Sequence, residues 1–156
     1  MVERFELAKG YEISRVVNGC WQLSEGHALQ SALDERDVIY AFTSLVESGF
    51  TTFDCADIYT GVEEFLGKFV GSLKDSSTVS PHQVQIHTKY VPDIDLLGKL
   101  TFSYTESIID RSLKRLGREV LDLVQFHWGD YNVPRAAETA GHLQLLKIKG
   151  KIRHLA

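Results

Sequence analysis

Four polar residues lie where apolar segments of the chain end, and their side chains carry the groups that proton transfer needs. They are Asp54, Tyr59, Lys89 and His127. The apolar segments before them span residues 50–53, 84–88 and 121–126. If these segments are parallel strands, their carboxyl ends share one rim, which is where parallel α/β folds build their sites. A carboxylate, a phenol, an ammonium and an imidazole on one rim would form a proton-delivery site.

Each of the four residues also has a simpler explanation when it is taken alone. An aspartate after a strand is commonly a loop cap, and the others could be a half-buried aromatic, a solvated lysine and a rim histidine. Their joint placement after three successive apolar segments favours the functional interpretation. Asp57 and His87 lie close to them in the sequence and are set aside, with His87 assigned to packing.

The elements that would position these residues alternate between strand and helix. Residues 5–13 are expected to form a hairpin that turns at Lys9-Gly10. Strands are expected at residues 15–19, 50–55, 84–88, 121–126 and 151–156, and helices at 34–49, 62–73, 103–117 and 134–150. Asp34 and a Ser103–Glu106 capping box mark two helix starts. The strand spacing is typical of βα units, whose right-handed crossovers would make the strands parallel.

Two arrangements of such units are open, both in the α/β class. One is half of an eight-unit barrel, and the other is an open doubly wound sheet of five strands. The length of 156 residues fits a single domain and favours the open sheet, because a closed barrel needs about 250 residues. The first βα loop, Gly19-Cys20-Trp21, has no following glycines and so lacks a dinucleotide fingerprint.

Composition excludes several classes of function. With 44% apolar residues the chain can build a core, and its net charge of −4 argues against a nucleic-acid partner. No apolar stretch approaches the ~20 residues that span a bilayer, so no membrane partner is expected. The polar segment 1–10 is not typical of a signal peptide. Cys20 and Cys55 are expected as reduced, half-buried thiols of a cytoplasmic protein, and no metal site is expected.

Several segments together resemble the aldo-keto reductase family. Phe53–Tyr59 resembles that family's aspartate–alanine–tyrosine segment, and Thr88-Lys89 its catalytic lysine segment. The further similar segments are Ser112–Gly117, Leu121–Trp128, Gly150–Arg153 and the Gly19-Cys20-Trp21 loop. The resemblance implies a partial TIM barrel of about four βα units plus a fifth strand, with an N-terminal β-hairpin as its bottom plug. Residues 1–156 would then be a single domain, the N-terminal half of an NADP-dependent oxidoreductase barrel.

The resemblance implies reduction of an aldehyde or ketone by hydride from NADPH, with NADH left open. Tyr59 would donate the proton that the carbonyl oxygen needs, because the nearby Lys89 ammonium stabilises the phenolate left behind. Asp54 would hold Lys89 in place and keep it charged. His127 would orient the substrate oxygen.

Further residues acquire roles through the same resemblance. Gly19, Cys20, Trp21 and Asp54 would contact the nicotinamide end of the cofactor. Trp21 and Trp128 would be walls of the pocket for a small carbonyl substrate.

Two departures from the family pattern affect these expectations. Thr60 stands between Tyr59 and Gly61, where the family usually has glycine directly, and this could shift the following helix start by one residue. The groups that hold most of the cofactor would follow strands five to eight. The chain alone is therefore expected to be weakly active or inactive, and to need a second copy as a homodimer or a missing C-terminal half. The alternative is a non-catalytic interaction or regulatory protein derived from an aldo-keto reductase.

Overall fold

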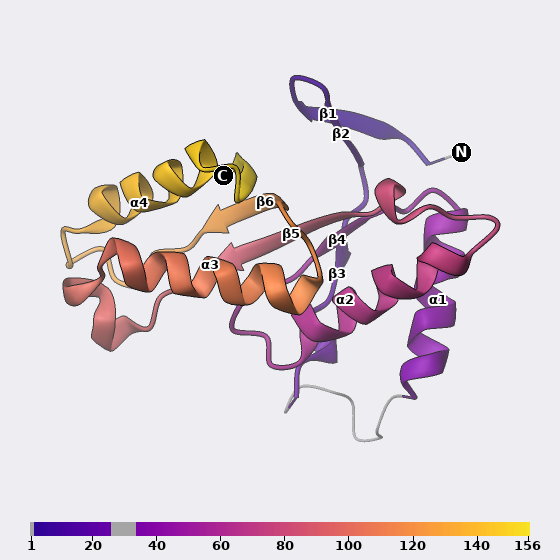
Figure 1. Cartoon of the computed structure of the whole chain (residues 1–156), viewed down its shortest axis with the longest axis horizontal. Helices are drawn as coiled ribbons and strands as arrows, with labels where there is room; N and C mark the ends of the chain where they lie inside the picture. Colours follow the sequence, from indigo (N-terminus) through magenta and orange to yellow (C-terminus); the bar gives the residue numbers. More distant parts are fainter. Residues whose placement is uncertain (1, 26–33) are drawn as a thin grey trace.

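The computed structural model describes residues 2–25 and 34–156, which form a hairpin and a five-stranded sheet (Figure 1). The antiparallel hairpin consists of β1 (Arg4–Ala8) and β2 (Tyr11–Ser14). The sheet strands are β3 (Asn18–Gly19), β4 (Thr52–Asp54), β5 (Gln85–Tyr90), β6 (Leu121–Phe126) and β7 (Ile152–Leu155). The helices are α1 (Glu35–Glu47), α2 (Val62–Ser72), α3 (Phe102–Leu116) and α4 (Ala136–Ile148), with 3₁₀ turns η1 (Trp21–Leu23), η2 (Leu73–Asp75), η3 (Pro81–Gln83) and η4 (Ile94–Lys99).

The order of the strands decides between the two expected arrangements. The sheet runs β3-β4-β5-β6-β7, and every neighbouring pair is parallel. A doubly wound sheet reverses its strand order at a switch point, whereas a barrel adds each new strand beside the last. The open doubly wound alternative is therefore wrong. The chain is an α/β fold with the topology of a half barrel, preceded by the expected hairpin.

Two expected boundaries are also wrong, for local reasons. The first sheet strand is limited to Asn18–Gly19, because the segment before it bends where the Ser14 hydroxyl donates to the Val16 carbonyl at 2.8 Å. The third helix begins at Phe102 and not at Ser103. Its N-cap is Thr101, whose extended backbone lets the side chain accept from the Tyr104 amide at 3.2 Å.

The two faces of the sheet carry different side chains because successive residues of a strand point to opposite sides. The outer face packs Phe53, Ile86 and Val124 into the main core together with the helices, for example with Leu66 and Ile109. The expected half-buried thiols are in fact fully buried there, since Cys20 and Cys55 are free and only 1% and 0% exposed. The opposite face is the inner face of the half barrel.

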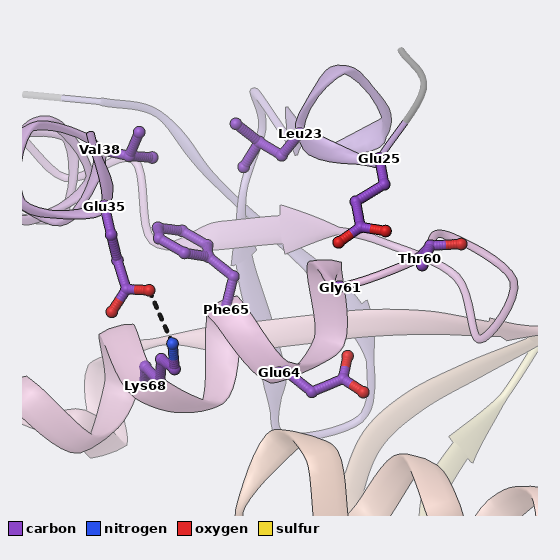
Figure 2. A pocket seen from close by; sticks show the side chains of 9 residues that line it. All are labelled: Leu23, Glu25, Glu35, Val38, Thr60, Gly61, Glu64, Phe65 and Lys68. Atoms are coloured by element: carbon purple, nitrogen blue, oxygen red, sulfur yellow. Dashed lines mark hydrogen bonds and ion pairs between the residues drawn. The ribbon is translucent and has the colours of Figure 1, made fainter. Parts of the chain in front are cut away.

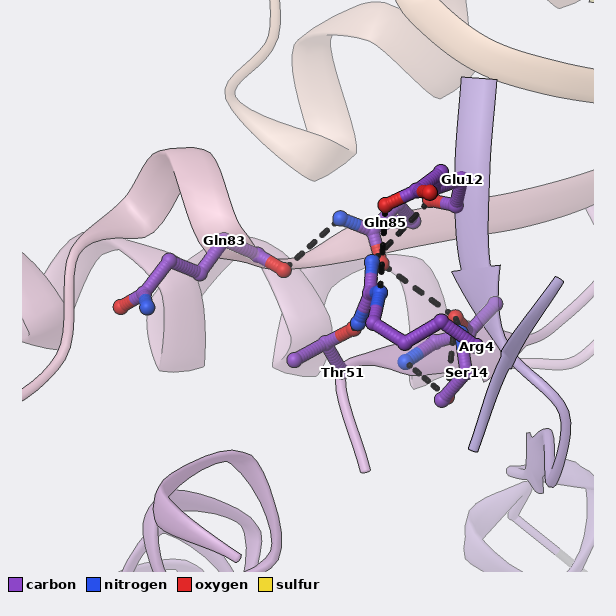
Figure 3. A network of polar contacts seen from close by, with 7 residues as sticks. Arg4, Glu12, Ser14, Thr51, Gln83 and Gln85 are labelled. Atoms are coloured by element: carbon purple, nitrogen blue, oxygen red, sulfur yellow. Dashed lines mark hydrogen bonds and ion pairs between the residues drawn. The ribbon is translucent and has the colours of Figure 1, made fainter. Parts of the chain in front are cut away.

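The hairpin is attached to the sheet at the amino ends of β4 and β5, as Figure 3 shows. Arg4 Nη1 donates to Thr51 Oγ1 at 3.0 Å, and Thr51 Oγ1 donates to Gln85 Oε1 at 2.7 Å. The Ser14 amide also donates to Thr52 Oγ1 at 3.0 Å. This network fixes the hairpin at the end of the sheet opposite to the rim that carries Asp54, Lys89 and His127.

Close packing of α2 on α3 depends on Gly67, which leads to a testable expectation. A Cβ atom at Gly67 would lie 2.2 Å from the Arg115 carbonyl oxygen. Gly67→Ala should therefore lower the free energy of unfolding by about 1–3 kcal/mol, the usual cost of overpacking. In the same helix, a Cβ at Gly71 meets nothing within 4 Å. Gly71→Ala should gain up to about 1 kcal/mol, and equal urea midpoints for the two variants would contradict the packing argument.

Candidate active site

The structure joins Asp54 and Lys89 at the carboxyl ends of β4 and β5. Lys89 Nζ donates to Asp54 Oδ2 at 2.5 Å and to the Cys55 carbonyl at 2.9 Å. The other carboxylate oxygen, Asp54 Oδ1, accepts from Gln125 Nε2 at 2.8 Å. An ammonium has three donors, and Asp54 and Cys55 use two of them. The lysine is thus held at a fixed position with one N–H left for another group.

Gln125 is a site residue that the sequence reasoning missed. It lies on β6 directly beside Lys89, because the parallel register pairs these two residues. Its signal in the sequence was weak but present: Gln125 is a polar residue near the end of a mostly apolar strand, two positions after the inward-facing Leu123. The Gln125 side-chain amide holds the Asp54 carboxylate in place, and that carboxylate in turn holds Lys89.

Tyr59 lies in the loop between β4 and α2, close to Lys89. Lys89 Nζ is 5.4 Å from the centroid of the Tyr59 ring, within the range of a cation–π contact. The loop is tightly turned, since the Tyr59 amide donates to the Ala56 carbonyl at 3.1 Å. Gly61 follows as the N-cap of α2 with a φ of 80°, so the extra Thr60 leaves the expected helix start at Val62 in place. Tyr59, Lys89 and Asp54 are therefore neighbours in space.

His127 and Trp128 follow β6 but occupy different environments. His127 is exposed at the same rim, where its amide donates to the Tyr90 carbonyl at 3.0 Å. Trp128 is 5% exposed and packs with Leu97 and Leu100, and its Nε1 donates to the Val133 carbonyl at 3.2 Å. The roles of both residues stay predictions. For Trp128 the observed place is a small apolar cluster beneath the rim.

The Gly19-Cys20-Trp21 segment adjoins Asp54 through its backbone. The Cys20 amide donates to the Asp54 carbonyl at 2.9 Å, which continues the β3–β4 pairing of Gly19 with Asp54. The Cys20 thiol points into the core, and burial raises its pKa to about 12, so the thiol stays neutral. Trp21 is 47% exposed at the rim. Gly19 lines the inner cavity together with Asp54, and the cofactor contacts of Gly19, Cys20 and Trp21 stay predictions.

A cavity of about 530 Å³ runs along the inner face of the half barrel below this rim. Its lining is mostly apolar and includes Gly19, Asp54, Gln125, His87 and Ala156, with Leu7, Ile13, Val17 and Leu123 from the hairpin side and β6. His87 is buried here, and its Nε2 is 2.9 Å from the Tyr11 hydroxyl of β2. Burial lowers the pKa of His87, which keeps its ring neutral and suits the packing assignment.

A second cavity, of about 400 Å³, lies between α1, α2 and η1, on the outer side of the loop that joins β4 to α2 and carries Tyr59 (Figure 2). Its charged lining consists of Glu25, Glu35, Glu64 and Lys68, and Lys68 Nζ donates to Glu35 Oε2 at 2.7 Å. Thr60 and Gly61 form its side toward the loop. None of the four predicted catalytic residues lines this cavity, whereas Asp54 lines the inner cavity, so the candidate active site is the inner one.

Asp57 is a buried carboxyl group that should make stability depend on pH. Burial is the main cause that raises its pKa to about 7, against a usual aspartate value near 3.9 in an unfolded chain. The folded state therefore binds the proton more tightly than the unfolded state. This contribution to stability is complete below about pH 4 and is lost as the pH rises through about 7.

The expected result is a free energy of unfolding that falls by up to about 1.4 kcal/mol per pH unit within that window. Asp57→Asn should remove this part of the slope, because the amide does not titrate. Urea unfolding of both proteins between pH 5 and pH 8 measures the difference. Parallel curves for parent and variant would show that Asp57 does not titrate in this range.

Residues 2–25 and 34–156 offer neither a metal-binding cluster nor a membrane-spanning helix. These residues contain no group of three or more His, Cys, Asp and Glu side chains placed to hold a metal ion. Their helices are too short or too polar for any one of them to cross a membrane.

Comparison with known proteins agrees with this geometry. Asp54, Tyr59 and Lys89 lie at the carboxyl ends of the strands, the rim at which α/β barrels place their sites. The sequence profile of the Aldo/keto reductase family matches residues 15–156. The chain belongs to the aldo/keto reductase family.

Three relatives show how far the similarity extends. "Probable aldo-keto reductase 1" of Glycine max is 31% identical over 149 residues, which cover 94% of this chain and 42% of that protein. Aldo-keto reductase YhdN of Bacillus subtilis is 30% identical over 151 residues, covering 92% and 43%. A Bombyx mori aldo-keto reductase crystallised with NADP matches in fold with a TM-score of 0.77 and 21% identity, covering 100% of this chain and 50% of that chain. The chain thus spans about half the length of the relatives it matches.

Proposed function

We propose that this chain carries the catalytic half of an NADPH-dependent reductase of aldehydes or ketones. The observation that supports this most is the contact of Lys89 with three groups: the Asp54 carboxylate, the Cys55 carbonyl and the Tyr59 ring. A lysine that served only as a solvated surface charge would not require a partner carboxylate that is itself held by a hydrogen bond from Gln125. Such restraint is typical of a group whose charge must stand at one place during a reaction.

The proposed roles follow from where negative charge would develop. Reduction of a carbonyl carbon leaves charge on its oxygen, and that oxygen needs a proton. Tyr59 would give the proton, and the Lys89 ammonium would stabilise the phenolate that forms. Asp54 would keep Lys89 charged and oriented, and the exposed His127 would hold the substrate oxygen from the other side of the rim.

The residues present fit one end of the cofactor. NADPH would supply the hydride when bound, as in other nicotinamide enzymes. Beside Asp54, Gly19 presents no side chain, and a Cβ there would meet nothing within 4 Å, so a flat ring has room. The residues that line the inner cavity include no lysine or arginine. The pyrophosphate and any 2′-phosphate would therefore need cations from outside that cavity, and this is the reason to expect weak activity of this chain alone.

A second candidate function, a non-catalytic interaction or regulatory protein, is favoured by the uncovered inner face. Leu7 and Val17 line the inner cavity and are 43% and 40% exposed. Quenching of protein fluorescence by added NADPH separates the two functions. Saturable quenching together with turnover of an aldehyde panel supports the reductase, whereas a stable folded protein without quenching supports the interaction protein.

The uncovered face also gives a prediction about assembly. Among the described residues, β3 and β7 each pair on one side only, and unpaired strand edges are templates for association. In a complete barrel the inner face is packed by layers of side chains. We expect the chain to elute in size-exclusion chromatography as a dimer or larger species, or to aggregate. A compact monomer at micromolar concentration would be the contrary result.

A further inference from the structure

The loop that carries Tyr59 is fixed to the end of β5 by one residue, Asp57. For this argument, residues 55–61 are named the Tyr59 loop. The loop first continues the parallel pairing of β4 with β5: the Cys55 amide donates to the His87 carbonyl at 2.8 Å and the Asp57 amide donates to the Lys89 carbonyl at 3.1 Å. The backbone then turns back, since the Tyr59 amide donates to the Ala56 carbonyl.

The turn leaves the next amide of the β5 segment, that of Val91, without a backbone partner in the loop. The Asp57 side chain takes this place, because its Oδ1 accepts from the Val91 amide at 3.1 Å. Asp57 thus contacts the chain on both sides of Tyr90, through its own N–H and through its carboxylate. Only Ile58 separates this two-point attachment from Tyr59.

Helix α3 holds the same residue from the other side. Arg115 Nη1 donates to the Asp57 carbonyl at 3.1 Å, and Arg111 Nη2 lies 3.6 Å from Asp57 Oδ2. The Asp57 side chain is only 4% exposed, so water does not compete for these bonds. Asp57 therefore has four attachments, two through its backbone N–H and C=O and two through its carboxylate, which is more than capping the end of a strand requires.

We propose that Asp57 is a positioning residue that fixes the Tyr59 loop to the end of β5 and thereby sets the place of the Tyr59 phenol relative to Lys89. This inference depends on the proposed reductase function only for its effect on catalysis. Its structural content, the geometry of Tyr59 and Lys89, is measurable without cofactor or turnover.

The charged and titratable groups that face Asp57 come from several elements. They are Glu63 of α2, Arg111, Arg115 and Tyr104 of α3, Asp93 of the segment after β5, and also Tyr90 of β5 itself. Burial, with a smaller effect of Glu63, raises the pKa of Asp57 to about 7, against the opposing effects of the Val91 hydrogen bond and of the two arginines. An ionised carboxylate is the stronger acceptor for the Val91 amide. The environment of Tyr59 should therefore respond to pH near neutrality through Asp57.

The test is nuclear magnetic resonance of the full chain labelled with ¹³C-tyrosine, with the Tyr59 signal assigned by its loss in Tyr59→Phe. Asp57→Ala removes the Val91 contact. A shift of about 1 Å, enough to cost about 100-fold in rate at an active site, would change the Tyr59–Lys89 NOE about threefold. We expect that change in Asp57→Ala, and an unchanged NOE would overturn the proposal.

Two further variants keep the test decisive if Asp57→Ala folds poorly. Asp57→Asn retains an oxygen for Val91, so it should keep the parental NOE and lose the shift of the Tyr59 signal near pH 7. A Tyr59 signal that still titrates there would overturn the proposal. The matched control is Asp122→Ala, which removes a carboxylate that accepts from the Ile86 amide at 3.0 Å near the opposite end of β5. It should lower stability and leave the Tyr59–Lys89 NOE at its parental value.

Discussion

Tyr59→Phe should lower the NADPH-dependent reduction of an aldehyde by about 100-fold or more, which is the usual contribution of a positioned general acid. The substitution removes only the hydroxyl, and the ring remains to fill its place beside Lys89. The loss should appear in kcat, because the proton is needed in the transition state and not for binding. NADPH affinity, measured by fluorescence quenching, should stay within about twofold of the parent, since the donor acts on the substrate oxygen.

The matched control for this experiment is Tyr40→Phe. Tyr40 is 77% exposed on α1 and is not among the residues of the site. Its variant should retain the parental rate, which excludes a general effect of losing a tyrosine hydroxyl. Equal rates for Tyr59→Phe and the parent would end the assignment of Tyr59 as the proton donor.

The largest loss of stability is expected from Arg115→Ala. Glu63 is completely buried, and its carboxylate has two partners: Thr88 Oγ1 at 2.8 Å and Arg115 Nη1 at 3.4 Å. Removing the arginine leaves a buried charge with one hydroxyl partner, which costs about 3–5 kcal/mol in proteins. The loss also reaches the site, because Thr88 precedes Lys89 and Arg115 holds the Asp57 carbonyl. Urea unfolding of the variant measures the change in the free energy of unfolding.

Lys68→Ala is the matched control for the buried pair. Lys68 and Glu35 are only 2.7 Å apart, yet both side chains are more than half exposed, so the pair should contribute about 1 kcal/mol or less. The double variant Glu63→Gln with Arg115→Met should recover at least half of the loss, because no buried charge then remains unpaired. If Lys68→Ala is as costly as Arg115→Ala, burial of Glu63 is not the cause.

The local features of the chain were predictable because they depend on near neighbours in sequence. The alternation of strands and helices, the Asp34 cap and the Lys9-Gly10 turn appear where they were expected, apart from the boundaries of the first sheet strand and of the third helix. The capping box at Ser103 was wrong because two hydroxyl residues stand at that helix start, and backbone conformation selected Thr101. The convergence of Asp54 and Lys89 was also predictable, since both end parallel strands.

Other members of the site depended on contacts between distant parts of the chain. Gln125 gave only a weak signal in the sequence, and the register of β6 against β5 placed it beside Lys89. The attachment of Asp57 to β5 depends on its bond to Val91. Trp128 packs with Leu97 and Leu100, a contact that depends on the position of η4, and its expected place at a pocket wall stays a prediction. No pattern within one segment contains these pairings.

The amino-acid sequence by itself determined the succession of βα units and the polar residues at their carboxyl ends, because both arise from side-chain periodicity and local capping. Only the tertiary structure decided that the strands follow one another in order across the sheet. It also decided which buried charges meet: Arg115 reaches Glu63 and the Asp57 carbonyl because α3 packs on α2 at Gly67. These contacts between distant residues are set by strand register and close packing, whose energies depend on residues far apart in the chain.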